Sequence, residues 1–161
     1  MKHAFHHDSE SETTHFLLEI AEAANSPLDL DHLLARIAGV VKKAIDYRIF
    51  AILLVNDRTQ EIRIRYDVGH PAEAKKLRIK VGRGITGKAV AERQTICIND
   101  IQSFPDYISV VEGVNAELAV PMILKDRVIG VIDVQSNQKN YFTPRHIELV
   151  ELIAGRVALA V

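Results

Sequence analysis

The order of helical and extended sequence patterns is the feature that most constrains this fold. Apolar residues recur at helical spacing over residues 13–24 and 30–45, and from residue 47 onward many of them alternate as in strands. Strands are expected at 47–55, 61–67, 77–81, 95–98, 118–124 and 128–134, and two more helices at 85–93 and from Pro144 to the chain end. Short polar turns join several strands where a doubly wound fold would need helices. The chain therefore predicts an α+β domain with a largely antiparallel sheet of about six strands.

Length and composition fit one globular domain. The chain has 161 residues, of which 48% are hydrophobic and 25% charged, and its net charge is −1. That charge does not favour a nucleic-acid partner, and no apolar run of about 18 residues indicates a membrane span. We expect a flexible tail over 1–12 and one domain over 13–161, cut from a longer regulatory protein and located in the cytoplasm. His3, His6 and His7 in the tail are interpreted as solvated polar residues, so no metal site is expected.

A glycine-rich segment, Gly82 to Lys88, offers the sharpest local motif. It fits G-x-G-x-x-G and nearly fits the phosphate-binding pattern G-x-x-x-x-G-K-[ST]. The second pattern needs a hydroxyl after the lysine to hold Mg²⁺, and Ala89 has none. The neighbouring hairpins do not form the βαβ units of a dinucleotide-binding fold. A tight turn from strand to helix is the favoured interpretation, and the wall of a ligand pocket is the alternative.

Two single residues could carry chemistry. Cys97 is the only cysteine, and in its short apolar strand the favoured interpretation is a small buried hydrophobe, with a reactive thiol as the alternative. Asp133 interrupts the apolar strand 128–134, so its carboxylate must find donors or water. Anchoring of a nearby loop is the favoured role for Asp133, and a ligand contact is the alternative.

Three stretches of the sequence, in this order and spacing, resemble the GAF domain family over residues 13–161. They are Val81 to Val90, then Ile98-Asn99-Asp100-Ile101 with Asp106-Tyr107, then Leu118 to Met122 followed by Val128 to Val134, Phe142 and the last helix. The resemblance implies terminal helices on one face of the sheet and a ligand pocket on the other, lidded by residues 82–93 and 99–115. Members of the family bind cyclic nucleotides, haem, bilins, 2-oxo acids or amino acids, so the cofactor or ligand stays unknown.

The same resemblance bears on enzymatic activity. Free methionine-R-sulfoxide reductases resemble this chain around Gly84-Ile85-Thr86-Gly87 and in the stretch 104–108. They differ in carrying a cysteine where Thr86 stands and another shortly after the second stretch. Residues 109–111 here are Ser, Val and Val, and a lone Cys97 elsewhere cannot run a thiol–disulfide cycle of that kind. We therefore expect the chain to lie outside that subfamily, to have no catalytic residues, and not to be an enzyme.

The main functional hypothesis is a signal-transduction module that senses a small molecule and relays it through its terminal helices to an output domain. A dimerisation and relay module without a ligand is the alternative, and a thiol enzyme using Cys97 is a third hypothesis. Cavity volume should separate the first two, because ligand pockets span roughly 300 Å³ or more. The residues expected to line the pocket are Arg65, Tyr66, Asp100, Tyr107 and Glu117. The broad apolar surface of the last helix predicts a homodimer across a two-fold axis.

Overall fold

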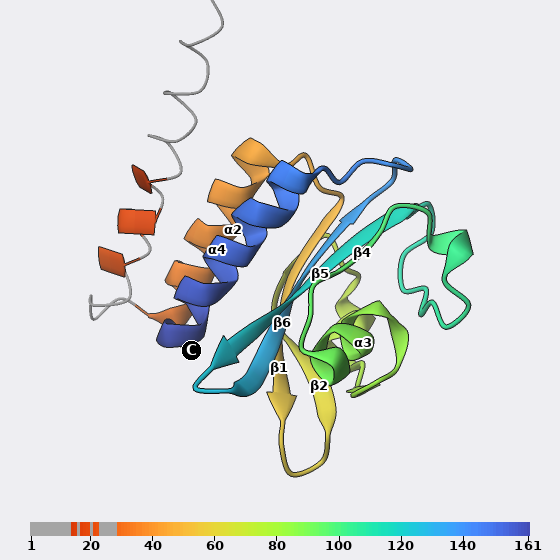
Figure 1. Ribbon diagram of the computed structural model, residues 1–161, viewed down its shortest axis with the longest axis horizontal. Helices are drawn as coiled ribbons and strands as arrows, with labels where there is room; N and C mark the ends of the chain where they lie inside the picture. Colours follow the sequence, from red (N-terminus) through yellow and green to blue (C-terminus); the bar gives the residue numbers. More distant parts are fainter. Residues whose placement is uncertain (1–13, 16, 20, 23–28) are drawn as a thin grey trace, which may run out of the picture.

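A computed structural model describes residues 14–15, 17–19, 21–22 and 29–161, and Figure 1 shows how their elements are arranged. The elements are α2 (Leu30–Ala44), β1 (Ile49–Asn56), β2 (Glu61–Val68), the 3₁₀ turn η1 (Ala72–Lys76), β3 (Ile79–Lys80), α3 (Gly84–Glu92), β4 (Ile96–Ile98), the 3₁₀ turn η2 (Ile101–Ser103), β5 (Ala116–Leu124), β6 (Arg127–Ser136) and α4 (Pro144–Ala160). The strands form one six-stranded sheet in the order β3-β2-β1-β6-β5-β4, with antiparallel neighbours throughout. The predicted α+β class and antiparallel sheet are confirmed.

The structure differs from the expected elements mainly in the third strand. The strand predicted over 77–81 shortens to β3, because η1 precedes it and ends where the Leu77 N–H donates to the Ala74 carbonyl at 3.0 Å. The described parts of the helix predicted over 13–24, residues 14–15, 17–19 and 21–22, are helical. The rest of that helix and the predicted tail over 1–12 lie outside the described residues.

Helices α2 and α4 cover one face of the sheet (Figure 1). The Asp29 side chain caps α2, and Thr143 and His146 form a reciprocal capping box at the start of α4, with Pro144 in its first turn. Between these helices and the sheet lies the main core, whose fully buried side chains include Leu34, Ile37, Val41, Phe50, Ile52, Leu118, Met122, Ile132 and Ile153. This helix layer anchors the back of the sheet and leaves the opposite face for other segments.

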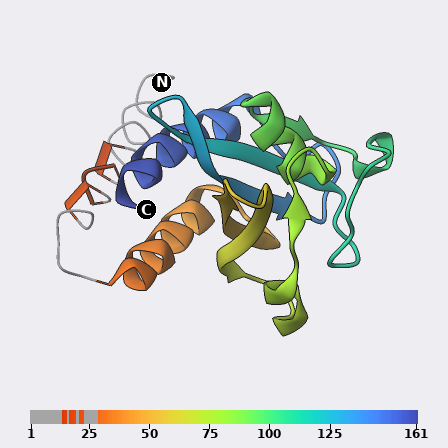
Figure 2. The same cartoon turned by 90° about the horizontal axis from the view of Figure 1, so that it is seen from below.

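The opposite face is covered by α3 and by the segments that flank it, as Figure 1 and Figure 2 show from two sides. A second apolar cluster forms there from Ala51, Leu53, Ile62, Ile79, Ile85, Ala89, Val90, Ala119 and Val131. The two strand alanines, Ala51 and Ala119, are small, so the sheet does not fill the space beneath α3 with bulky side chains. This arrangement leaves room for a pocket on the central strands.

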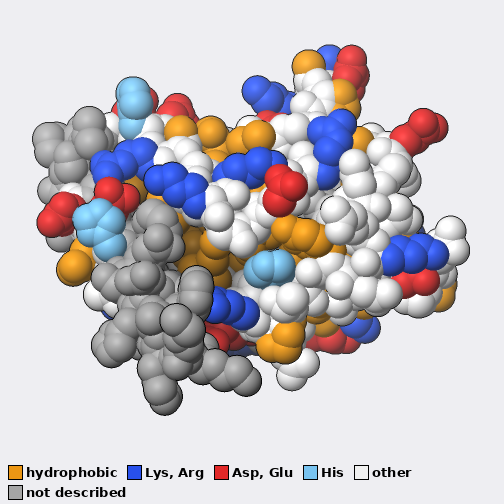
Figure 3. Space-filling view, turned by 90° about the horizontal axis from the view of Figure 1, so that it is seen from above, with side chains coloured by type: hydrophobic (Ala, Val, Ile, Leu, Met, Phe, Trp, Pro, Cys, Tyr) orange, Lys and Arg blue, Asp and Glu red, His pale blue; other side chains and the backbone are white. Residues whose placement is uncertain are grey.

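The surface carries charges of both signs. Figure 3 shows basic and acidic side chains interspersed with apolar ones on the face seen from above Figure 1. Within the described residues, no helix combines the length and the apolar character that crossing a membrane requires.

Candidate functional site

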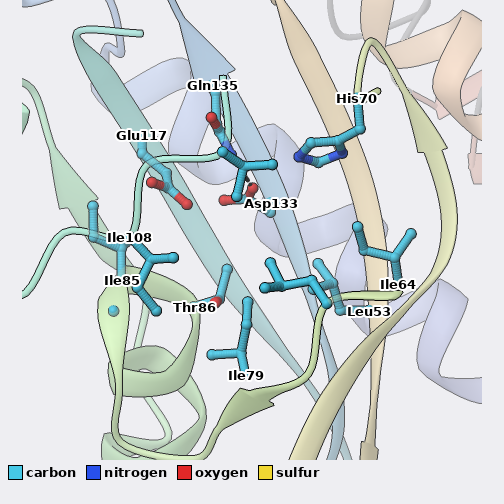
Figure 4. A pocket seen from close by; sticks show the side chains of 13 residues that line it. Leu53, Ile64, His70, Ile79, Ile85, Thr86, Ile108, Glu117, Asp133 and Gln135 are labelled. Carbon is cyan, nitrogen blue, oxygen red and sulfur yellow. Dashed lines mark hydrogen bonds between the residues drawn. The ribbon is translucent and has the colours of Figure 1, made fainter. Parts of the chain in front are cut away.

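A pocket lies on the sheet face opposite α2 and α4, beneath the start of α3 (Figure 4). Its lining residues are Leu53, Ile64, His70, Leu77, Ile79, Gly84, Ile85, Thr86, Ile108, Val110, Glu117, Asp133 and Gln135. Strands β1, β2, β5 and β6 supply the floor, and α3 and the 104–113 loop supply the roof. Its volume of about 30 Å³ is space for one or two waters.

Two carboxylates face each other across neighbouring strands of this pocket (Figure 4). Glu117 on β5 is 5% exposed and Asp133 on β6 is 3% exposed. Gln135 lies opposite Glu117 in the strand register, and its side-chain N–H donates to Asp133 Oδ2 at 2.6 Å. Asp133 Oδ1 has no hydrogen-bond partner. A buried acceptor without a donor is costly, so this oxygen is suited to bind a donor from outside the chain.

Burial controls the protonation of this acid pair. Desolvation raises the pKa of Glu117 well above its usual range, and the charge of the neighbouring Asp133 acts in the same direction. Two buried carboxyl groups so close together cannot easily carry two negative charges, so this arrangement favours a proton on Glu117. A cation placed between them would relieve the repulsion and let both ionise.

A charged contact holds the 104–113 loop over the pocket. Arg83 donates to both carboxylate oxygens of Asp106, at 2.7 Å from Nη2 and 2.9 Å from Nε, and the Gly84 N–H donates to Asp106 Oδ2 at 2.9 Å. These hydrogen bonds, those from Arg83 first, lower the pKa of Asp106 to about 2. Ile108 packs so closely on Gly84 that a Cβ there would lie 2.9 Å from Ile108 Cδ1. The loop and the start of α3 therefore form one joined roof.

This arrangement favours the structural interpretation of the glycine-rich motif. A Cβ at Gly87 would lie 2.7 Å from the Lys80 carbonyl oxygen, and the Gly82 N–H donates to the Gly87 carbonyl at 2.8 Å. The first N–H group of α3, which a phosphate would use, already binds Asp106. The motif thus forms a tight turn into α3 and also contributes Gly84 to the pocket wall.

Of the five residues predicted to line the pocket, Glu117 does so and Tyr107 lies beside it. Tyr107 packs against the apolar cluster under α3. Its own burial raises the pKa of Tyr107, and the nearby charges of Glu117 and Asp133 raise it further. Asp100 lies elsewhere: its side chain accepts from the Gln102 N–H at the start of η2. A role of these residues in ligand binding stays a prediction.

Arg65 and Tyr66 lie toward the helices and outside the residues that line the pocket. Arg65 pairs with Asp31 of α2 at 2.6 Å, and Tyr66 packs against the core cluster beneath α2 and α4. The cause is a β-bulge: Ile52 pairs with Tyr66 but the next residue, Leu53, pairs with Ile64, so Arg65 is an extra residue. Strict alternation from Ile62 and Ile64 would put Tyr66 on the pocket face of the sheet, and the bulge turns it to the face that α2 and α4 cover.

Besides Asp133, for which a ligand contact was the alternative role, three polar residues of the pocket were not among those predicted to line it: His70, Thr86 and Gln135. Gln135 could have been found, because it lies two residues after Asp133 and so shares its face of β6. Thr86 lies within the glycine-rich motif and is 6% exposed. No sequence pattern marks His70, which reaches the pocket only through a turn after β2.

Cys97 lies on the other side of the sheet from the pocket. It packs against the core cluster beneath α2 and α4, whereas its neighbours Ile96 and Ile98 pack against the cluster under α3. Burial raises the pKa of the Cys97 thiol, which disfavours the reactive thiolate. Cys97 thus packs as a small hydrophobe, but it is only partly buried, where full burial was expected. Among the described residues, no group of three or more His, Cys, Asp or Glu side chains could hold a metal ion.

A family profile described as a GAF domain matches residues 27–161, so this chain belongs to the GAF domain family. Over 67 residues, 42% of this chain and 41% of the relative, it is 39% identical to a free methionine-R-sulfoxide reductase of Escherichia coli strain K12. Over 163 residues, 94% of this chain and 23% of the relative, it is 24% identical to the formate hydrogenlyase transcriptional activator FhlA of the same organism. The aligned segments thus span less than half of either relative.

Solved structures show the same fold. A free methionine-R-sulfoxide reductase from Neisseria meningitidis, in complex with its substrate, superposes with a TM-score of 0.75 at 27% identity, over 92% of this chain and 89% of that one. The similarity to a transcriptional activator supports a regulatory role for the domain.

The expectation that this chain is not an enzyme is corrected by these comparisons. Free methionine-R-sulfoxide reductases, which are enzymes, occur both among its relatives and among the structures that share its fold. The exclusion of that subfamily is likewise not confirmed. Thr86 stands where those reductases carry a cysteine, and this difference bears only on a mechanism that needs a thiol at that position. The pocket and its pair of carboxylates are present all the same.

Proposed function

We propose that this chain is a regulatory GAF domain whose pocket binds a small molecule carrying an ammonium group. The observation that carries the proposal is the buried pair of Glu117 and Asp133, with Asp133 Oδ1 left without a donor. An ammonium group offers three donors and one positive charge. It would satisfy this oxygen and remove the repulsion that keeps a proton on Glu117.

The relatives suggest which molecules to try. The reductases act, by name, on free methionine-R-sulfoxide, a molecule with an ammonium group. The similarity to the activator FhlA supports a regulatory role. We therefore include in the proposal an output domain and a relay of the signal to it through the terminal helices. We therefore take free amino acids, and methionine sulfoxide first, as the probes of this pocket.

The pocket must open to admit such a molecule. Its volume of about 30 Å³ is far below the roughly 300 Å³ of a usual ligand pocket. The roof formed by Arg83, Asp106 and Ile108 is the part able to move, because the floor belongs to paired central strands. The small volume is also the observation that favours the second candidate function, a relay module that binds no ligand.

Isothermal titration calorimetry tests the ammonium site directly. We expect the protein to bind L-methionine-(R)-sulfoxide but not 4-(methylsulfinyl)butanoic acid, which lacks the ammonium group. Asp133→Asn should weaken binding at least about tenfold, because it removes the charge that faces the cation. Analysis of the recovered sulfoxide for methionine separates a bound ligand from a substrate.

The exposed Asp126, in the turn between β5 and β6, supplies the control variant Asp126→Asn, which should bind as the wild type does. Equal affinity for the two probes would contradict the ammonium site. No binding of either probe would favour the relay module without a ligand.

A homodimer through α4 remains part of the proposal. Leu152 is 44% exposed and Leu159 is 67% exposed, and their spacing of two helical turns places them on one face of α4. We expect light scattering at concentrations up to about 100 μM to give twice the chain mass of 18.0 kDa, and Leu159→Glu to lower the mass to that of one chain. A mass of 18.0 kDa at every concentration would remove the dimer.

A further inference from the structure

His70 is the second buried polar group of the pocket that lacks a partner. Its side chain is 5% exposed, and its Nδ1 makes no hydrogen bond. The nearest carboxylate oxygen, Asp67 Oδ2, lies 3.6 Å from Nδ1, which is too long for a hydrogen bond. Figure 4 shows one edge of the imidazole turned toward Asp133 across the pocket.

The sheet register explains why the ring lies there. Asp67 on β2 pairs with Ala51 on β1, and Ala51 pairs in turn with Asp133 on β6. The three residues form one row across the sheet, and the small Ala51 leaves space between the two carboxylates. At Gly69 the chain turns after β2 and brings His70 to this row of residues. The turn requires glycine, because its φ is +95° and a Cβ there would lie 2.5 Å from the Arg48 carbonyl oxygen.

His70 is also the one pocket-lining residue, among those the structure describes, that can carry a positive charge. The other ionisable residues in the lining are Glu117 and Asp133, and no lysine or arginine is present. Asp67, whose side chain is 8% exposed, can balance a charge on the ring. Among the described lining residues, His70 is therefore the side chain that can offer an anionic group of a ligand an opposite charge.

We propose that His70 recognises a carboxylate of the ligand, so that this pocket selects a free α-amino acid over a simple amine. The inference rests on the proposed function, in which Glu117 and Asp133 hold the ammonium group. In an α-amino acid the ammonium and carboxylate groups share one carbon, and this matches a ring edge directed at Asp133 (Figure 4). The imidazole would thus bind the carboxylate of the zwitterion, and the acid pair would bind its ammonium group.

The pairing of His70 with the ligand carboxylate is tested by measuring two ligands, with and without a carboxylate, on the wild-type protein and on His70 variants. The probes are L-methionine-(R)-sulfoxide and its α-carboxamide, which keeps the ammonium group but has no carboxylate. We expect the wild-type protein to bind the acid at least about tenfold more tightly than the amide, and His70→Leu to lose this preference by weakening the acid alone. His70→Gln, which keeps a polar side chain of similar reach, should also lose most of it.

Folding is checked by circular dichroism and thermal unfolding, and His70→Gln carries the test if His70→Leu does not fold. The exposed His32 of α2 gives the control variant His32→Gln, which should keep the wild-type preference. If both His70 variants keep the preference for the acid, the inference is overturned and the ammonium site stands. If the wild type binds neither probe, the inference and the proposed function fail together.

Discussion

Replacing Glu117 by glutamine is expected to stabilise the empty protein at neutral pH while weakening binding of an amino-bearing ligand. Glutamine keeps the shape of the glutamate side chain but carries no charge to bury. In the wild type, folding holds a proton that the unfolded chain releases above the ordinary pKa of 4.5. We expect the variant to gain on the order of 1 to 3 kcal/mol of unfolding free energy at pH 7.

The stability difference between Glu117→Gln and the wild type should grow as the pH rises. Below pH 4.5 both states of the wild type are protonated at Glu117, and the free energies of unfolding of the two proteins should differ least. As the pH rises above 4.5 toward the raised pKa of folded Glu117, the wild type should lose stability relative to the variant. The loss can reach about 1.4 kcal/mol per pH unit. Urea unfolding between pH 4 and pH 8 measures this difference.

Glu148, exposed on α4, supplies the matched control. Glu148→Gln makes the same chemical change at the surface and should leave the pH dependence as it is in the wild type. A constant difference between Glu117→Gln and the wild type across this pH range would contradict a raised pKa in the folded state. Gain of stability with loss of binding would identify Glu117 as a residue kept for a ligand at a cost to the fold.

Local patterns were sufficient to predict most of the fold. The pair Thr143-Pro144 indicated the start of α4, because Thr caps a helix and Pro suits its first turn. The paired strands β5 and β6 followed from two apolar segments around a short polar turn. β3 was less predictable, since two paired residues give too short a pattern to separate from the neighbouring turn.

The site was less predictable, because its members meet only through long-range pairing. Asp133 was recognised as a buried carboxylate, but its partner Glu117 belongs to another strand, and the register that joins them is not a property of either segment. Tyr66 was misplaced because a single extra residue, Arg65, changes the faces of β2. The position of His70 depends on the turn at Gly69 and on the small Ala51, which pairs with Asp67 on one side and with Asp133 on the other. No local pattern reveals this pairing.

Gly130 lies where the backbone of a neighbouring strand comes unusually close. A glycine inside a strand usually weakens it, and often marks a place where another backbone comes near. In the structure, Gly130 on β6 lies between β1 and β5, opposite Leu54 and Met122. A Cβ there would lie 2.3 Å from the Leu53 carbonyl oxygen and 2.4 Å from Met122 Cε. The first contact is to backbone, so side-chain rotation cannot relieve it.

Gly130→Ala is therefore expected to lower the free energy of unfolding by about 3 kcal/mol or more, since β1 must shift to accommodate one methyl group. For a domain of this size the loss corresponds to a fall of roughly 6 to 12 °C in Tm. The matched change Gly39→Ala, at an exposed position of α2 with nothing within 4 Å of the added Cβ, should instead stabilise the protein by about 0.5 to 1 kcal/mol. Thermal and urea unfolding of the two variants measure both effects. Because Leu53 also lines the pocket, a Gly130→Ala protein with unchanged stability would show that the central strands yield more easily than the close contact implies, and that the floor of the pocket can move as well as its roof.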